Sequence, residues 1–209
     1  NAQTIDENQI RMMEDIHSNT VRTYFSPTPD LIDALGAGNQ HVVVGIPNFD
    51  DRNHPGPDMS TGTAVPYINS IKNYPAVLMY ELGNEYNYYP EYFDGDIDNY
   101  LDFVNAKAAE YKKIDPHHPI SIAWGYDVSD PAAKVGLKRA MEKAPNIDVW
   151  GLNIYNGDNL TDTINEVKQL SDKPIYISET GADSYNQSED KEDQQMQADA
   201  MVNLYNSVK

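Results

Sequence analysis

The chain has 209 residues, of which 40% are hydrophobic, and it carries a formal net charge of -18 with a pI near 4.4. A nucleic-acid partner and an anionic membrane surface are disfavoured, because both are bound through a basic face. The sequence contains no cysteine, which excludes disulfides and thiolate metal sites. No apolar run approaches the ~20 residues that span a bilayer.

The predicted elements alternate between short strands and longer helices. An amphipathic helix over residues 5–16 comes first. Short apolar runs rich in β-branched residues then predict six strands, at residues 20–25, 41–46, 76–81, 120–124, 147–152 and 174–179. Stretches of helical period predict further helices at residues 30–35, 63–73, 96–114, 131–143, 160–170 and 189–208.

This alternation is typical of βα units around a parallel sheet. A closed TIM-type (β/α)8 barrel has eight strands and ~250 residues. We therefore expect one α/β domain over residues 1–209, a barrel of this type that is incomplete, with its first and eighth strands missing from the chain. A truncated chain, flanking segments, a six-strand closure and completion by another chain all stay open as explanations. Exposed parallel edges would favour self-association.

Two glutamates lie at or just after the ends of predicted strands, at the edge where parallel α/β folds collect functional side chains. Glu85 ends the run VLMYELGNE, which begins at Val77. Glu179 ends the run PIYISE, which begins at Pro174. The chemistry that this pair suggests is carboxylate catalysis.

With these motifs the chain resembles the largest clan of retaining glycosidases, clan A, whose barrels carry an Asn-Glu pair after the fourth strand and a single Glu after the seventh. It is most similar to the barrel domains of family 2 glycosidases, the β-galactosidase and β-glucuronidase relatives, and to β-glucanosyltransferases. The resemblance runs from about Ile5 to the last helix. Counting an absent first strand, Asn84-Glu85 and Glu179 fall after strands four and seven. The clan's tryptophan after the eighth strand has no match here.

The resemblance implies that Glu85 is the general acid/base and Glu179 the nucleophile. In the retaining mechanism one carboxyl protonates the leaving oxygen while a carboxylate ~5–5.5 Å away attacks the anomeric carbon. The resemblance also implies that Asn84 holds the sugar 2-hydroxyl near Glu179. The structural alternatives are a solvated side chain for Glu85 and a loop carboxylate for Glu179.

Four further residues are candidates for the site. Arg22 lies in an apolar strand, where an unpaired guanidinium is costly to bury; the resemblance implies that it bonds the nucleophile, the alternative being a rim salt bridge. Tyr155 matches the clan's tyrosine that donates to the nucleophile, unless it merely packs. Trp124 is a candidate platform for stacking on sugar, with burial between strand and helix as the alternative. Asn48 is a candidate contact for sugar hydroxyls.

Three other features carry less weight. Residues 94–98 begin like a calcium loop but lack the glycine and glutamate that an EF-hand requires, so helix capping by Asp96 or Asp98 is the better interpretation. The adjacent histidines at 117–118 are disfavoured as a metal site. Glu81 shares a strand with the acid/base motif and faces either a helix or the barrel interior.

We therefore expect a hydrolase of β-linked glycosides or glucans that acts with retention on an oligo- or polysaccharide and needs no cofactor. A transglycosylase on the same site is one alternative. A non-catalytic carbohydrate-binding protein with an incomplete barrel is another. Because polysaccharide-active enzymes are mostly secreted, we expect a secreted or extracytoplasmic location.

Overall fold

The computed structural model describes residues 5–47, 49, 62–155, 157 and 159–209. Within these ranges six strands form one parallel sheet in the order β1-β2-β3-β4-β5-β6. The strands of this sheet are β1 (Thr20–Arg22), β2 (His41–Gly45), β3 (Val77–Asn84), β4 (Ile120–Gly125), β5 (Val149–Asn153) and β6 (Ile175–Glu179). The α-helices are α1 (Glu7–Asp15), α2 (Pro29–Ala37), α3 (Ala64–Ile71), α4 (Ile97–Ile114), α5 (Ala133–Lys143), α6 (Thr161–Val167) and α7 (Gln194–Val208).

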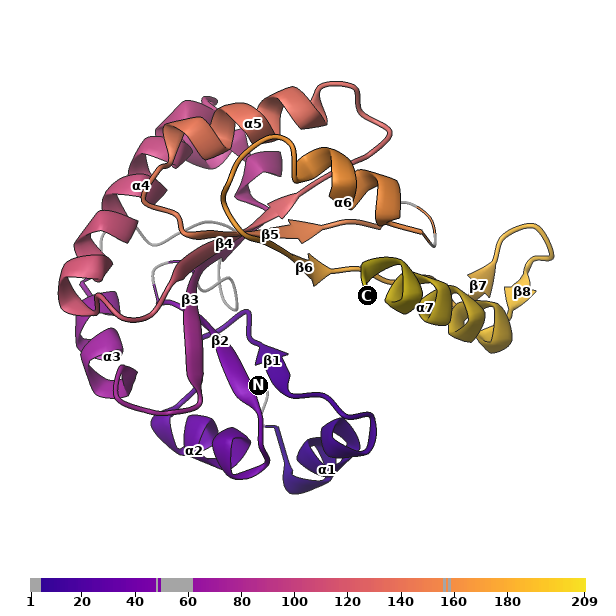
Figure 1. The fold of residues 1–209 in the computed structure, drawn as a ribbon, viewed down its shortest axis with the longest axis horizontal. Helices are drawn as coiled ribbons and strands as arrows, with labels where there is room; N and C mark the ends of the chain where they lie inside the picture. Colours follow the sequence, from indigo (N-terminus) through magenta and orange to yellow (C-terminus); the bar gives the residue numbers. More distant parts are fainter. Residues whose placement is uncertain (1–4, 48, 50–61, 156, 158) are drawn as a thin grey trace.

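The sheet curls into an open half-barrel, with α2 to α6 along its outer side (Figure 1). The prediction of an incomplete TIM-type α/β barrel is therefore confirmed. Each of the six predicted strands is present, as are the predicted helices, with their ends shifted by a few residues. A small antiparallel hairpin of β7 (Tyr185–Asn186) and β8 (Lys191–Glu192) precedes α7 and was not predicted, because two-residue strands are too short to show a period.

The hydrophobic core lies between the sheet and its outer helices. It contains Val42 and Val44 of β2, Leu82 of β3 and Trp150 of β5, all of which are fully buried. These residues alternate with others that point to the concave side of the sheet, since successive strand side chains face opposite ways. Burial of this outer face fixes which side chains must turn inward.

The concave face of the sheet is polar. Glu81, Ser121 and Asn153 are buried there, and Arg22 on β1 lies close to them. Buried polar groups require hydrogen-bond partners. The inner face therefore carries a connected network instead of an apolar filling.

Strand β3 is longer than predicted, and its extension positions the Asn-Glu pair. The predicted strand stops at Glu81, whereas β3 runs on to Asn84, which pairs with Ala123 of β4 after a shift of register. Gly83 adopts φ 84, a value that favours glycine, within this irregular part. The shift displaces Asn84 relative to the regular pleat.

The starts of α1, α2 and α4 carry side-chain caps. Asp6 and Gln9 form a capping box at α1, and Thr28 caps α2 just before Pro29. Asp96 accepts a hydrogen bond from the Asp98 amide at 2.9 Å, which confirms the capping interpretation for α4. None of the helices in the described ranges has both the length and the apolar character to cross a membrane.

Candidate active site

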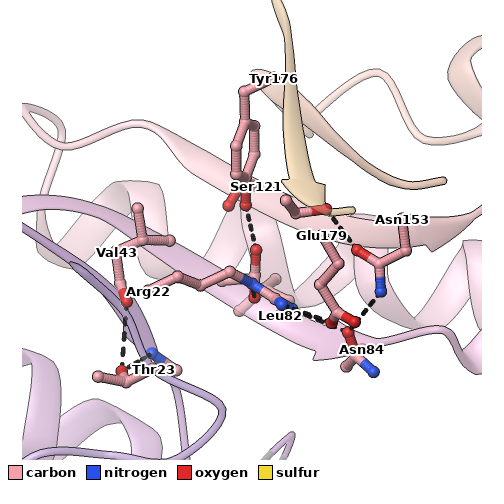
Figure 2. A network of polar contacts seen from close by, with 12 residues as sticks. Arg22, Thr23, Val43, Leu82, Asn84, Ser121, Asn153, Tyr176 and Glu179 are labelled. Atoms are coloured by element: carbon pink, nitrogen blue, oxygen red, sulfur yellow. Dashed lines mark hydrogen bonds and ion pairs between the residues drawn. The ribbon is translucent and has the colours of Figure 1, made fainter. Parts of the chain in front are cut away.

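Arg22 is the centre of the polar network on the concave face. Its Nε donates to Glu81 Oε1 at 2.6 Å, and one terminal nitrogen donates to Glu179 Oε1 at 2.7 Å. The other terminal nitrogen donates to Asn84 Oδ1 at 2.8 Å. Figure 2 shows the guanidinium reaching toward Asn84 and Glu179, which come from different strands. One side chain thus ties β1 to β3 and β6.

Glu179 is held as an ionised carboxylate. Its Oε1 accepts from Arg22, and its Oε2 accepts from the Tyr155 hydroxyl at 2.7 Å. Burial alone would raise the pKa of Glu179, but hydrogen bonds from Tyr155, Arg22 and Tyr24 outweigh it and hold the pKa below its usual range. The same bond, together with burial, raises the pKa of Tyr155 to about 12.

Asn84 is oriented by two donors. Its Oδ1 accepts from Arg22 and also from Asn153 Nδ2, at 3.0 Å. Asn153 is held in turn by the Ser178 hydroxyl, which donates to its Oδ1 at 2.6 Å. Because its oxygen is fixed in this way, the amide nitrogen of Asn84 is the end that can donate to a ligand.

Glu85 follows directly in an unusual backbone conformation. It has φ 55, in the left-handed region, where a residue with a side chain is strained. Its amide donates to the Ala123 carbonyl at 2.9 Å, so the strain is held in place by β4. The half-buried Glu85 ends the strand pairing and begins the short 3-10 helix η1 (Tyr86–Tyr88).

Glu85 and Glu179 both act on the Tyr155 hydroxyl. Burial is the main cause of the raised pKa of Tyr155, the bond to Glu179 adds to it, and the charge of Glu85 adds further. Contacts of Arg22 relate the positions of the two glutamates, because it donates both to Glu179 and to Asn84, the residue that precedes Glu85. The structure thus brings the two predicted catalytic residues to one mouth of the half-barrel, together with Asn84, Arg22 and Tyr155; a carboxyl separation of ~5–5.5 Å stays a prediction.

The loop after Glu85 is pinned to the end of β4. Asn87 donates from Nδ2 to the Gly125 carbonyl at 2.9 Å and accepts from the Gly125 amide at 2.9 Å. The Tyr88 ring covers Gly125 so closely that a side chain at this position would overlap it. This bracing limits how far Glu85 can move relative to β4.

Trp124 is not at the mouth. The residue is 6% exposed and belongs to the core cluster, and its ring centroid lies 5.8 Å from that of Trp150 in an edge-on contact. Strand alternation turns it to the helix side of β4, so the expected stacking platform is corrected to a core residue, as the burial alternative held. Asn48 lies outside the described residues.

Exposed aromatic side chains do occur near the mouth. Tyr24, Tyr88, Tyr89 and Tyr155 are each at least 41% exposed. Tyr24 also lies under the Arg22 guanidinium, whose carbon is 4.6 Å from the ring centroid. Rings of this kind can stack on the apolar faces of sugars.

Sequence reasoning missed several residues of the network, among them Asn153 and Ser178, which orient Asn84. Tyr24 could have been found, because it lies two residues after Arg22 within the predicted strand at residues 20–25, although in the structure it follows β1. Tyr176 donates to Glu81 Oε2, a contact between residues that are 95 positions apart. Glu81 itself was left undecided between the two faces, and it points inward.

The chemistry available at this mouth is that of carboxylates and amides. Among the described residues, no group of three or more His, Cys, Asp or Glu side chains is arranged to hold a metal ion. His118, considered as a metal ligand above, instead contacts Asp115 through Nδ1 at 2.6 Å, at the amino end of β4. An ionised carboxylate beside an oriented amide and a second carboxyl can perform acid/base and nucleophilic steps.

No protein-family model and no curated protein sequence matches the chain. Solved structures do match in fold. An FMN-binding β-glucuronidase from Facaelibacterium prausnitzii superposes with a TM-score of 0.67 at 16% identity, over 96% of this chain and 31% of that protein. An exo-β-1,4-mannosidase from an Opitutaceae bacterium gives 0.65 at 14% identity, over 98% of this chain and 46% of that protein.

A third structure is an active-site mutant of a β-1,3-glucanosyltransferase from Rhizomucor miehei in complex with laminaritriose. It gives a TM-score of 0.60 at 19% identity, over 93% of this chain and 73% of that protein. The chain therefore has the barrel-type fold of these glycoside hydrolases and this transferase. It spans 31% and 26% of the length of two of the β-glucuronidases that it matches.

Proposed function

We propose that this chain is a retaining glycosidase unit that cleaves β-linked glycosides or glucans by double displacement. The observation that carries the proposal is the environment of Glu179. Its carboxylate accepts from Arg22 and Tyr155 and has a lowered pKa, so it is ionised at neutral pH. An ionised, oriented carboxylate inside a mouth lined by tyrosines suits attack on an anomeric carbon.

In this proposal Glu179 attacks the anomeric carbon and forms a covalent glycosyl-enzyme. Glu85 protonates the leaving oxygen, and in the second step the same residue takes a proton from the water that releases the sugar. Asn84 donates from its amide nitrogen to the 2-hydroxyl, because its oxygen is bound by Arg22 and Asn153. Arg22 and Tyr155 keep Glu179 in place during both steps.

The structural neighbours support the substrate class. They include a β-glucuronidase, an exo-β-1,4-mannosidase and a β-1,3-glucanosyltransferase. Each of these names denotes an enzyme that acts on carbohydrate. The choice of sugar and linkage is left to experiment.

The test uses a panel of aryl β-glycosides with good and poor leaving groups. Glu179→Ala should abolish turnover, and Glu85→Ala should slow poor leaving groups by about 10²–10⁴-fold while affecting good ones less. Glu166→Ala, on the outer helix α6, is the control, and it should match the parent chain. Unchanged rates in both site variants, or sugar binding without turnover in the parent, would refute the proposal.

Product analysis completes the test. NMR of the first-formed sugar should show the β-anomer, as retention requires. An α-anomer would exclude double displacement. Products longer than the substrate would indicate transglycosylation on the same site, because an acceptor sugar would then outcompete water.

A further inference from the structure

We propose that Glu81 is a positioning residue for Glu179, which it controls through Arg22. The expected effect on reaction rate rests on the proposed function, but the expected effect on the pKa of Glu179 does not. Glu81 is the second carboxylate that binds Arg22. It holds the guanidinium in place and shares its positive charge, so that Glu179 is oriented without losing its basicity.

The contacts form a continuous chain beneath the mouth. Tyr176 on β6 donates to Glu81 Oε2, and Glu81 Oε1 accepts from Arg22 Nε at 2.6 Å. Arg22 then donates to Glu179 Oε1 at 2.7 Å. Arg22 uses a different nitrogen for each carboxylate, so the direction in which it reaches Glu179 is set by its bond to Glu81.

Glu81 has no access to a substrate. Its residue exposure is 2%, and its neighbours in register are Gly45 on β2 and Ser121 on β4. A buried carboxylate that is neither solvated nor in reach of a ligand is costly unless it is paired. Glu81 therefore acts by pairing with Arg22 and not by contact with a substrate.

The charge on Arg22 is divided between two carboxylates. Burial raises the pKa of Glu81 and repulsion from Glu179 adds to this, whereas Arg22 and the bond from Tyr176 favour its ionised form. If Glu81 loses its charge, Arg22 acts on Glu179 alone and the repulsion disappears. Both changes favour the ionised form of Glu179, so its pKa falls and it becomes a weaker nucleophile.

Other charged and titratable groups face these two carboxylates. Around Glu179 they are Arg22 on β1, Tyr24 after β1, Tyr155 after β5, Glu81 on β3 and, through Tyr155, Glu85. Around Glu81 they are Arg22, Tyr176 on β6, Tyr100 on α4 and Glu179. The tyrosines have raised pKa values and stay neutral near pH 7. A change in the pKa of Glu179 in the Glu81→Gln variant therefore reports the lost charge of Glu81.

The experiment compares Glu81→Gln with the parent chain. Glutamine keeps an oxygen that accepts from Arg22 but carries no charge. We expect the acid limb of the kcat/KM profile to move about one pH unit lower, and kcat to fall about tenfold with little change in KM. Glu81→Ala should cost on the order of 10²-fold in kcat, because Arg22 also loses its anchor.

Asp115→Asn is the matched control. Asp115 is also a buried carboxylate that accepts from a tyrosine, Tyr80, at 2.6 Å, but it lies at the amino end of the sheet. The Asp115→Asn substitution should lower the free energy of unfolding without moving the acid limb of the kcat/KM profile. If Glu81→Gln behaves in the same way, losing stability with an unmoved acid limb and parent kcat, Glu81 is merely structural and the proposal is overturned.

A spectroscopic titration separates this inference from the proposed function. Carbon-13 NMR of the glutamate carboxyls, assigned with Glu179→Gln, gives the pKa of Glu179 even if no turnover is found. A lower pKa in Glu81→Gln supports the inference, and an unchanged value refutes it. Should Glu81→Gln fail to fold, Tyr176→Phe removes one bond to Glu81 and keeps its charge; a smaller fall in kcat is expected, and parent kcat would contradict the role.

Discussion

Replacing Gly83 by alanine tests how the backbone before the Asn-Glu pair is built. Gly83 has φ 84, and a Cβ added there would overlap the ring of Tyr86. That ring cannot move aside easily, since it is 2% exposed and packs edge-on against Tyr92, Phe93 and Tyr100. The substitution therefore meets both a backbone penalty and a steric one.

The two penalties can be separated with Gly95, which has φ 79 and nothing within 4 Å of an added Cβ. A left-handed conformation costs an alanine about 1–2 kcal/mol. Overpacking of a filled core adds about 1–3 kcal/mol. We expect Gly95→Ala to lose only the first amount, and Gly83→Ala to lose about 2–5 kcal/mol in free energy of unfolding.

Urea unfolding of both variants against the parent chain measures the difference. Glu85 adjoins Tyr86, so Gly83→Ala should also lower kcat/KM for an aryl β-glycoside, whereas Gly95→Ala should leave it unchanged. Equal losses of stability in the two variants would refute the argument from the Tyr86 contact. Parent-like kcat/KM in a folded Gly83→Ala chain would refute its extension to Glu85.

Three further predictions follow from other contacts. Burial would raise the pKa of Asp115, but hydrogen bonds from Tyr80 and His118 lower it to about 2. The ionised carboxylate therefore contributes on the order of 2 kcal/mol to the free energy of unfolding above pH ~4, and this contribution is lost as the pH falls toward 2. Asp115→Asn should therefore be less stable than the parent at pH 6 but approach it at pH 2.5 in urea unfolding, and a constant gap would contradict this. Tyr155→Phe removes a bond worth about 1.5–3 kcal/mol to the Glu179 carboxylate, so the acid limb of kcat/KM should move up in pH, opposite to Glu81→Gln; a downward shift would exclude the assigned contact. Because β1 and β6 are the edges of the described sheet and α7 exposes Val202 and Tyr205, light scattering should give a mass above one chain, and a single-chain mass would end the self-association hypothesis.

Local patterns were sufficient for the six strands of the main sheet and for the α-helices, but not for the β7/β8 hairpin. The β-branched runs identified all six sheet strands because their alternation with helical segments reflects one buried face per element. Glu179 ends one such run and Glu85 comes four residues after another, and the resemblance to the glycosidase motifs singled out both. The extension of β3 beyond Glu81 could not be predicted, because the last residue pairs between β3 and β4 depend on a shift of register.

What the sequence determined by itself was the order of strands and helices, because periodicity within each element shows it, while the resemblance to the glycosidase motifs implied the barrel class and the acids at the strand ends. Only the tertiary structure decided that Trp124 faces the core and that Glu81 faces inward to Arg22. The contacts of Arg22 with Glu81 and Glu179 join residues 59 and 157 positions apart. Such contacts are set by the curl and register of the whole sheet, and no local pattern encodes either.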